Sequence, residues 1–176
     1  MHHASDLINL FERCFTAEFH TVLEGGADEP FYQPGTTETP SRIIFTRDYF
    51  ASALHEVAHW CVAGEERRKL PDYGYWYAPD GRSPEQQAEF ERVEIKPQAL
   101  EWLFSKACGA PFRVSADNLN SGLGASAEFK SNIAAQARLY CTALPYRPAR
   151  FVATLSDFYG TGNVLQPELY SVAELR

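Results

Sequence analysis

The chain has 176 residues, a length that suits one domain spanning residues 1–176 with a sizeable buried core. Its 45% hydrophobic and 14% aromatic content excludes a disordered chain. The formal net charge of −7 argues against broad nucleic-acid binding and mildly favours a cationic partner, although a solvated acidic surface is the commoner explanation of such a charge.

Cysteine usage and hydropathy indicate a cytoplasmic protein. The four cysteines are widely spaced, without a CxxC pair, and are predicted to be free buried thiols in a reducing compartment: Cys14, Cys61, Cys108 and Cys141. We find no secretory signal and no apolar run long enough to span a bilayer, so no membrane association is expected. His2 and His3 are assigned no structural role.

The first part of the chain is predicted to contain a helix, a loop and a strand. Apolar residues recur with a period near 3.6 over residues 5–23, which predicts an amphipathic helix ended by Gly25 and Gly26. Residues 24–40 are rich in Gly, Pro and Thr and are predicted to form a loop. Residues 42–46 are β-branched or aromatic and predict a strand.

A helix is predicted for residues 48–64, with Gly64 as a left-handed cap, and it contains the sequence His55-Glu56-Val57-Ala58-His59. Residues four apart lie on one helix face, so both imidazoles can reach one transition-metal ion. The alternative is a chance match on a buried helix. Because this helix is apolar on nearly every side, two histidines and a glutamate inside it are costly unless hydrogen-bonded or metal-bound. A metal site is therefore favoured.

The second half of the chain is predicted to be mainly helical. Residues 73–77 look like a strand before a Pro79-Asp80-Gly81 turn. Ser83, Pro84 and Glu85 predict the start of a helix that runs to about residue 107, with Pro97 as a point where it kinks or splits. Two further helices are expected at 126–142 and 148–159. The fold class is therefore α+β, predominantly helical with a small sheet.

Two imidazoles hold a metal loosely, so a third protein ligand is expected. No histidine follows His59, which leaves a carboxylate or, less favourably, Cys61. On the 83–107 helix, Glu94 falls on the border of the apolar stripe, whereas Glu91 points toward solvent. Glu101 shares that border two turns further on, so Glu94 is the first choice and Glu101 the second.

Two histidines and one carboxylate permit two chemistries. With zinc, the ion would activate water and Glu56 would act as general base in a hydrolase, either a peptidase or a ribonuclease. With ferrous iron, the same arrangement leaves positions for dioxygen and substrate and supports oxygenation. The types of ligand alone do not choose between them.

Three sequence blocks carry a resemblance to a known family. HEVAHWC at residues 55–61, GYWYAPDGR at 74–82 and VEIKPQAL at 93–100 together resemble the elongation factor P hydroxylase family. Shorter matches lie at 28–30, 42–45 and 147–151, so the resemblance covers roughly residues 5 to 160. HExxH is shared with many zinc peptidases, whereas the other two blocks are specific.

The resemblance implies an activity, a fold and a set of ligands. Members of this family hydroxylate the β-lysylated lysine of bacterial elongation factor P, with a fold similar to that of an endoribonuclease of ribosomal RNA maturation. It implies ferrous iron as cofactor, replaceable by zinc or another divalent metal in purified protein, and dioxygen as a reactant. The metal ligands carried over are His55, His59 and Glu94.

The residues themselves also indicate a role for Glu56 and a location for a substrate pocket. Glu56 suits an orienting or proton-handling role beside His55, with a purely structural contact to the backbone as the alternative. A lysyl substrate needs carboxylates for its ammonium groups and apolar walls for its methylenes. The candidates are Tyr75, Trp76, Tyr77 and Asp80, although this aromatic cluster could equally belong to the core.

Overall fold

The structure is a computed structural model that describes residues 1–76, 81–116 and 124–176. Its sheet has three strands, β1 (Thr21–Ala27), β2 (Phe31–Gln33) and β3 (Ser41–Thr46), in the order β1-β3-β2. β3 pairs with β1 in parallel and with β2 in antiparallel orientation. Ile43 and Phe45 of β3 are buried, as expected from the alternation of a strand with one covered face.

Helices make up most of the described chain. The α-helices are α1 (Ala4–Phe11), α2 (Ala17–Phe19), α3 (Phe50–Val62), α4 (Pro84–Cys108), α5 (Ala127–Thr142) and α6 (Tyr146–Tyr159). A π-helix, Glu12–Thr16, joins α1 to α2, and short 3₁₀ turns lie at Arg67–Lys69, Pro71–Gly74, Pro167–Leu169 and Val172–Glu174. The prediction of a mainly helical fold with a small sheet is confirmed, whereas the likeness to the endoribonuclease fold stays a prediction.

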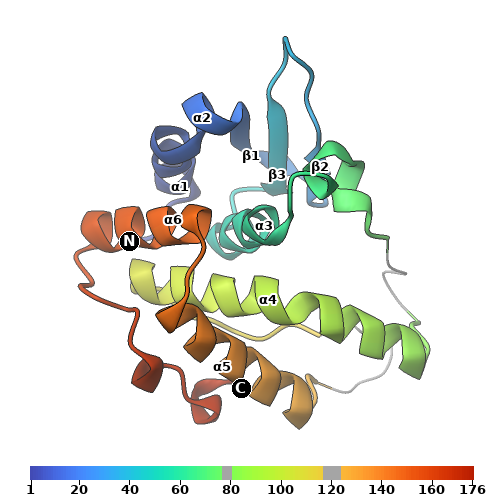
Figure 1. Cartoon of the computed structure of the whole chain (residues 1–176), viewed down its shortest axis with the longest axis vertical. Coiled ribbons are helices and arrows are strands. Elements are labelled where there is room, and N and C mark those ends of the chain that lie inside the picture. Colours follow the sequence, from blue (N-terminus) through green and yellow to red (C-terminus); the bar gives the residue numbers. More distant parts are fainter. Residues whose placement is uncertain (77–80, 117–123) are drawn as a thin grey trace.

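α3 is the central helix of the molecule. It packs against β3 on one side and against α4 on the other, and α4 crosses the middle of the structure between α3 and α5 (Figure 1). Leu54, Val57 and Trp60 are fully buried, which is why this helix is apolar on nearly every side. The predicted burial of the helix that carries HExxH is therefore confirmed.

The end of α3 is capped by arginines from elsewhere in the chain. The Arg147 guanidinium on α6 donates to the carbonyl oxygens of Trp60 (2.7 Å), Cys61 (3.3 Å) and Ala63 (2.8 Å). Arg68 donates to the Ala63 carbonyl at 2.7 Å. Charged donors thus satisfy carbonyls that have no partner inside the helix. The predicted left-handed cap at Gly64 is wrong, because Ala63 leaves the helix in an extended conformation and Gly64 has no positive φ.

α4 begins and ends almost where its sequence predicts. Ser83 accepts a hydrogen bond from the Gln86 amide, and the Gln86 side chain accepts one from the Ser83 amide, which closes a capping box. At the other end Gly109 takes the left-handed conformation, with φ 65°. The helix continues through Pro97, so it is not split there.

The first predicted helix is too long, and the segment after it, predicted as a loop, contains strands. The helix ends at Phe19, because His20 adopts φ 49° and Thr21 begins β1. Gly25 and Gly26 therefore lie in a strand, and the segment 24–40 contains part of β1 and all of β2. The apolar spacing of Phe19, Val22 and Leu23 fits either element, and the ladder with β3 decides it.

The strand predicted at residues 73–77 is also wrong within the described residues. Pro71–Gly74 forms a 3₁₀ turn in which Asp72, Tyr73 and Gly74 have φ values of 48°, 60° and 77°. Positive φ is incompatible with an extended strand. Most of the Pro79-Asp80-Gly81 turn, and Tyr77 with it, lies outside the described residues.

The remaining predictions are confirmed for the two later helices and for the free cysteines, but not for His2 or for the burial of Cys141. The helices expected at 126–142 and 148–159 are α5 and α6, and α6 begins two residues earlier at Tyr146. All four cysteines are free thiols, and Cys141 is only half-buried. His2 does have a structural role, because its Nε2 lies 2.7 Å from the Cys108 carbonyl oxygen. Within the described residues, no helix is long and apolar enough to cross a membrane.

Candidate metal centre

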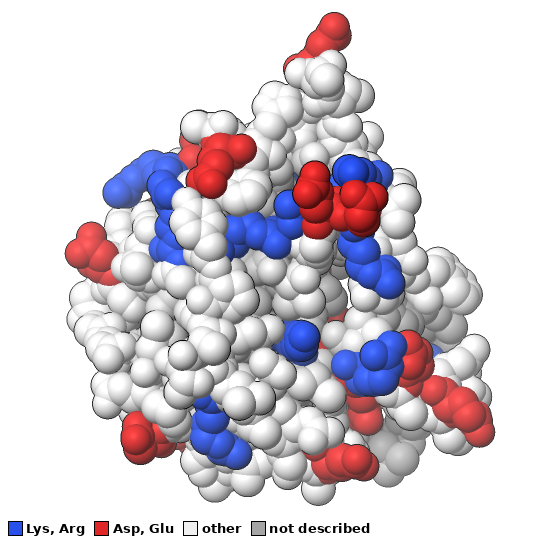
Figure 2. All heavy atoms as spheres, in the orientation of Figure 1, with Lys and Arg blue, Asp and Glu red and all other residues white. Residues whose placement is uncertain are grey.

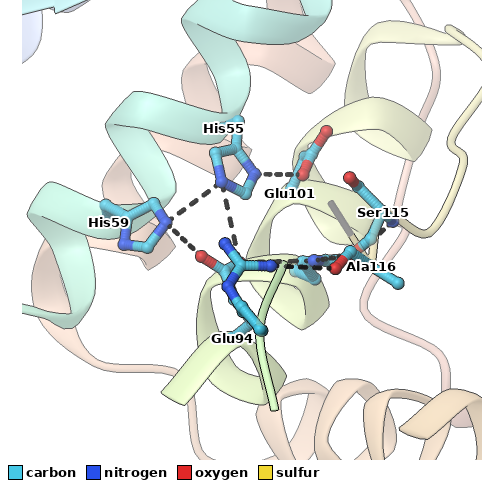
Figure 3. A network of polar contacts seen from close by, with 8 residues as sticks. His55, His59, Glu94, Glu101, Ser115 and Ala116 are labelled. Atoms are coloured by element: carbon cyan, nitrogen blue, oxygen red, sulfur yellow. Dashed lines mark hydrogen bonds and ion pairs between the residues drawn. The ribbon is translucent and has the colours of Figure 1, made fainter. Parts of the chain in front are cut away.

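Three side chains from α3 and α4 converge on one point. His55 and His59 lie on the same face of α3, and Glu94 of α4 faces them (Figure 3). The His59 Nε2 atom lies 3.0 Å from His55 Nε2 and 2.9 Å from Glu94 Oε1, and His55 Nε2 lies 3.6 Å from Glu94 Oε2. One donor atom from each residue lies within 4.8 Å of the other two, so the group could hold a metal ion.

The spacing of these atoms fits a shared ion. Two donors that are each about 2.1 Å from one ion, at right angles, lie about 3.0 Å apart. Two imidazole nitrogens and a carboxylate oxygen are also a donor set that zinc and ferrous iron accept. Both the chemistry and the geometry therefore suit a divalent metal held on one face by three protein ligands.

Glu101 holds His55 in the orientation that such an ion requires. Its Oε2 lies 2.7 Å from His55 Nδ1, on the side of the ring away from His59 (Figure 3). With Nδ1 donating to this carboxylate, Nε2 keeps its lone pair facing Glu94 and His59. Glu101 is thus a partner of a candidate ligand and does not belong to the converging group itself.

Glu94 is held by a polar contact that the sequence reasoning missed. The Gln98 side chain is 1% exposed, and its Nε2 donates to Glu94 Oε2 at 3.3 Å. The same amide donates to the Ser115 carbonyl (2.7 Å) and accepts from the Ser115 amide (3.0 Å), which fixes its orientation. The i, i+4, i+7 spacing of Glu94, Gln98 and Glu101 was a signal that could have found it.

Charge pairing dominates the titration of the centre. Burial by itself would raise the pKa of Glu94, but the nearby His59 and His55 lower it to about 2. Burial likewise opposes protonation of His55, but Glu101 and Glu94 raise its pKa well above the usual value. Glu94 therefore stays ionised and attracts positive charge, whether that charge is an imidazolium proton or a bound cation.

Neither Glu56 nor Cys61 belongs to the converging donors. Glu56 is half-buried, makes no hydrogen bond with another described residue, and has a pKa raised mainly by burial. Burial raises the pKa of the Cys61 thiol to about 12, so it remains protonated and is a poor metal ligand. The sequence analysis ranked Cys61 below a carboxylate as the third ligand, and its absence from the converging donors agrees with that order.

The other side of the histidine pair is formed by the Pro71–Gly74 turn. Asp72 Oδ1 accepts from the Tyr32 amide at 2.9 Å, and the rings of Tyr32 and Tyr73 stack with centroids 4.3 Å apart. The Tyr73 ring also lies parallel to His59, at 6.5 Å. Its hydroxyl is buried and has no hydrogen-bond partner in the described part of the chain. This turn brings Tyr73 to the wall of a cavity that His59 also lines.

Of the residues predicted to form a substrate pocket, the structure describes Tyr75 and Trp76. Tyr75 lines the cavity beside His59, and the Trp76 side chain is 81% exposed, so Trp76 is not a core residue. Tyr77 and Asp80 lie outside the described residues. Contact of any of these residues with a substrate remains a prediction.

Comparison with known proteins identifies the family. Residues 10–170 match the family described as "Elongation factor P hydroxylase". The chain is also 49% identical, over 162 residues, to a protein of Haemophilus influenzae named elongation factor P lysine hydroxylase, and the match covers 91% of each chain. The chain belongs to the elongation factor P hydroxylase family. Membership places the chain among enzymes, and the α3–α4 centre lies within the part of the chain that matches the family.

Proposed function

We propose that this protein hydroxylates the β-lysylated lysine of elongation factor P, using dioxygen and a ferrous ion. The observation that carries the proposal is the convergence of His55, His59 and Glu94 in a chain of the hydroxylase family. We further propose that residues 1–176 act as one cytoplasmic hydroxylase domain, with elongation factor P as its protein partner and no nucleic acid or membrane involved.

His55, His59 and Glu94 would hold the ion. When bound, ferrous iron supplies the activation of dioxygen that carbon hydroxylation needs, and zinc or another divalent metal can replace it during purification without supporting that chemistry. Three protein ligands on one face leave the opposite face for reactants. Glu101 and Gln98 orient His55 and Glu94, so the donors are in place before the ion arrives.

Glu56 is proposed to handle protons at this centre. It follows His55 in the chain, is half-buried, and has a pKa raised above its usual value, so it exchanges a proton more readily near neutral pH than an exposed glutamate does. It makes no hydrogen bond with another described residue, and its carboxyl group is therefore available to water or substrate. We assign it no role as a metal ligand.

The decisive experiment compares oxygen-dependent hydroxylation with hydrolysis. β-Lysylated elongation factor P is incubated with the enzyme and ferrous iron, with and without dioxygen, and its mass is measured. A gain of one oxygen atom that requires both iron and dioxygen is expected. Cleavage of peptides or RNA with zinc, together with no mass gain on elongation factor P, would establish the hydrolase alternative in which Glu56 is the general base.

A further inference from the structure

A cavity of about 380 Å³ opens directly beside the metal centre, with His59 in its wall. Its other walls come from the end of α3, from residues 67–75, from α4 and from Gln136 of α5. The apolar part of the lining consists of Val62, Ala63, Val93, Ile95 and Pro97, joined by the rings of Tyr73 and Tyr75. The volume lies in the range of about 300–1,000 Å³ that is usual for small-molecule sites.

The charged side chains of this cavity are all of one sign. Arg67, Arg92 and Lys96 line it, and its described lining contains no Asp or Glu. The whole chain has the opposite balance, with 23 acidic and 16 basic residues. Figure 2 shows Lys and Arg side chains around a hollow on this face, with Asp and Glu side chains directly beside them. The charged side chains that line the cavity are therefore basic on an acidic protein, whereas the Glu94 carboxylate lies 2.9 Å from His59 in its wall.

The three basic side chains differ in the contacts that fix their positions. Arg67 donates to the Tyr73 carbonyl at 2.9 Å, and its guanidinium lies 3.9 Å from the centroid of the Tyr75 ring, so its position is fixed. Arg92 pairs with Glu89 at 2.6 Å, which offsets part of its charge. Lys96, by contrast, is exposed and forms no hydrogen bond or ion pair with any residue in the described part of the chain. Its ammonium group is available to a ligand.

We propose that this cavity binds a carboxylate-bearing organic group next to the metal centre, with Lys96 as its main charged contact. An ammonium beside a fixed guanidinium favours a carboxylate, and the apolar walls favour one attached to a short carbon chain over an inorganic anion. The same charges repel a lysyl ammonium group. The cationic substrate side chain therefore approaches the metal from outside this cavity, contrary to the expectation that Tyr75 helps to form the lysyl pocket.

The carboxylate can come from two sources. One is a free organic acid, and the other is an acidic side chain of the protein that carries the substrate lysine. Only the second source rests on the proposed function. In both cases the carboxylate pairs with Lys96 and the candidate metal ligands stay unchanged. One set of Lys96 variants therefore tests both sources.

The first arm titrates the full-length protein with succinate and follows backbone amide shifts by NMR. Metal content is kept equal in all samples by elemental analysis. Succinate is expected to shift the amides of residues 67–75 and 92–97 in the wild type and in Lys96→Arg. In Lys96→Gln its affinity should fall about tenfold, as expected for losing a charged hydrogen bond. Lys130→Gln is the matched control, because this α5 lysine does not line the cavity.

The second arm measures the affinity of β-lysylated elongation factor P for the same variants. A loss confined to Lys96→Gln, without succinate binding, assigns the cavity to an acidic side chain of the protein substrate. A Lys96-dependent response to succinate assigns it to a free organic acid. Equal binding of both probes to the wild type and Lys96→Gln overturns the proposal, as does tighter binding of n-butylamine than of succinate in the cavity.

Discussion

The two sides of the histidine pair differ in how completely their polar groups are paired. On the α4 side the polar groups that face the pair are held by partners, since Glu101 pairs with His55 and Gln98 holds Glu94. On the side of residues 67–75, a turn with left-handed residues leaves a buried Tyr73 hydroxyl unpaired among the described residues and a cavity beside His59. The difference indicates that one side fixes the candidate metal ligands, while the other leaves a cavity beside them.

The α4 side can be rigid because its charges compensate one another. Glu94 and Glu101 are 5% and 8% exposed, and buried carboxylates are costly unless paired. Each therefore needs a histidine, and each histidine needs its carboxylate. The opposite side has no such pairing at Tyr73, and this contrast leads to four predictions, from the largest effect to the smallest.

The most severe change is Glu94→Ala on the α4 side. Removing one of three donors should lower metal affinity by more than about 100-fold, because two imidazoles alone bind loosely. Metal content is measured by elemental analysis after anaerobic loading, and circular dichroism checks the fold. Glu91→Ala is the control, since Glu91 lies on the same helix but outside the converging group. Full occupancy in Glu94→Ala together with loss in Glu101→Ala would make Glu101 the third ligand.

A weaker effect on the same side is expected for Glu101. Glu101→Ala should lower metal affinity about 10- to 100-fold, because His55 loses the partner that fixes its ring. Glu101→Gln keeps an acceptor for His55 Nδ1 and should lose less. Competition with a metal-binding dye gives both affinities. If the two variants bind metal as tightly as the wild type, the contact has no role in orienting His55.

The sequence predicted the α4 side well and the opposite side poorly. The helix-face argument identified Glu94 and Glu101 because a long helix has a regular 100° period, and Ser83 and Gly109 mark its ends. The turn at Asp72 and Tyr73 carries no such signal, since non-glycine residues with positive φ are uncommon. Their conformation depends on a contact with Tyr32, forty residues away, that no local pattern reveals.

The same distinction explains the start of the chain. Residues 5–19 form helical structure as predicted, but β1 depends on a parallel ladder with β3 that joins residues about twenty positions apart. Non-local pairing of this kind overrides the helical spacing of Val22 and Leu23. For the candidate site, residue types and spacing were enough to predict that His55, His59 and Glu94 converge, whereas Gln98 and the cation-lined cavity emerge only from the packed structure.

On the turn side, Asp72→Ala should change stability and leave metal affinity unaltered. The variant loses the acceptor for the buried Tyr32 amide and places alanine at φ 48°, so unfolding free energy should fall by about 1–3 kcal/mol. Asp72→Asn is the matched control, because asparagine tolerates positive φ and keeps an acceptor oxygen. Urea denaturation measures the difference. A large loss of metal affinity in Asp72→Ala would show that the two sides are coupled.

The smallest effect is expected for Tyr73→Phe. This change removes a buried hydroxyl that has no partner in the described residues and keeps the ring stacked on Tyr32. Unfolding free energy should therefore stay unchanged or rise by up to about 1 kcal/mol. Thermal melts of the metal-free protein provide the measurement. A clear loss of stability would mean that the hydroxyl is satisfied by ordered water, and the turn side would then be as fully paired as the α4 side.

The arginine cap on α3 has a consequence for how the enzyme matures. Arg147 follows the carbonyl groups that it caps by 84 to 87 residues in the chain. On the ribosome the helix that carries both histidines therefore emerges long before its cap is made. Glu94 is likewise synthesised after those histidines. We expect the nascent chain to bind a divalent metal ion weakly, so that metal loading follows release of the finished polypeptide.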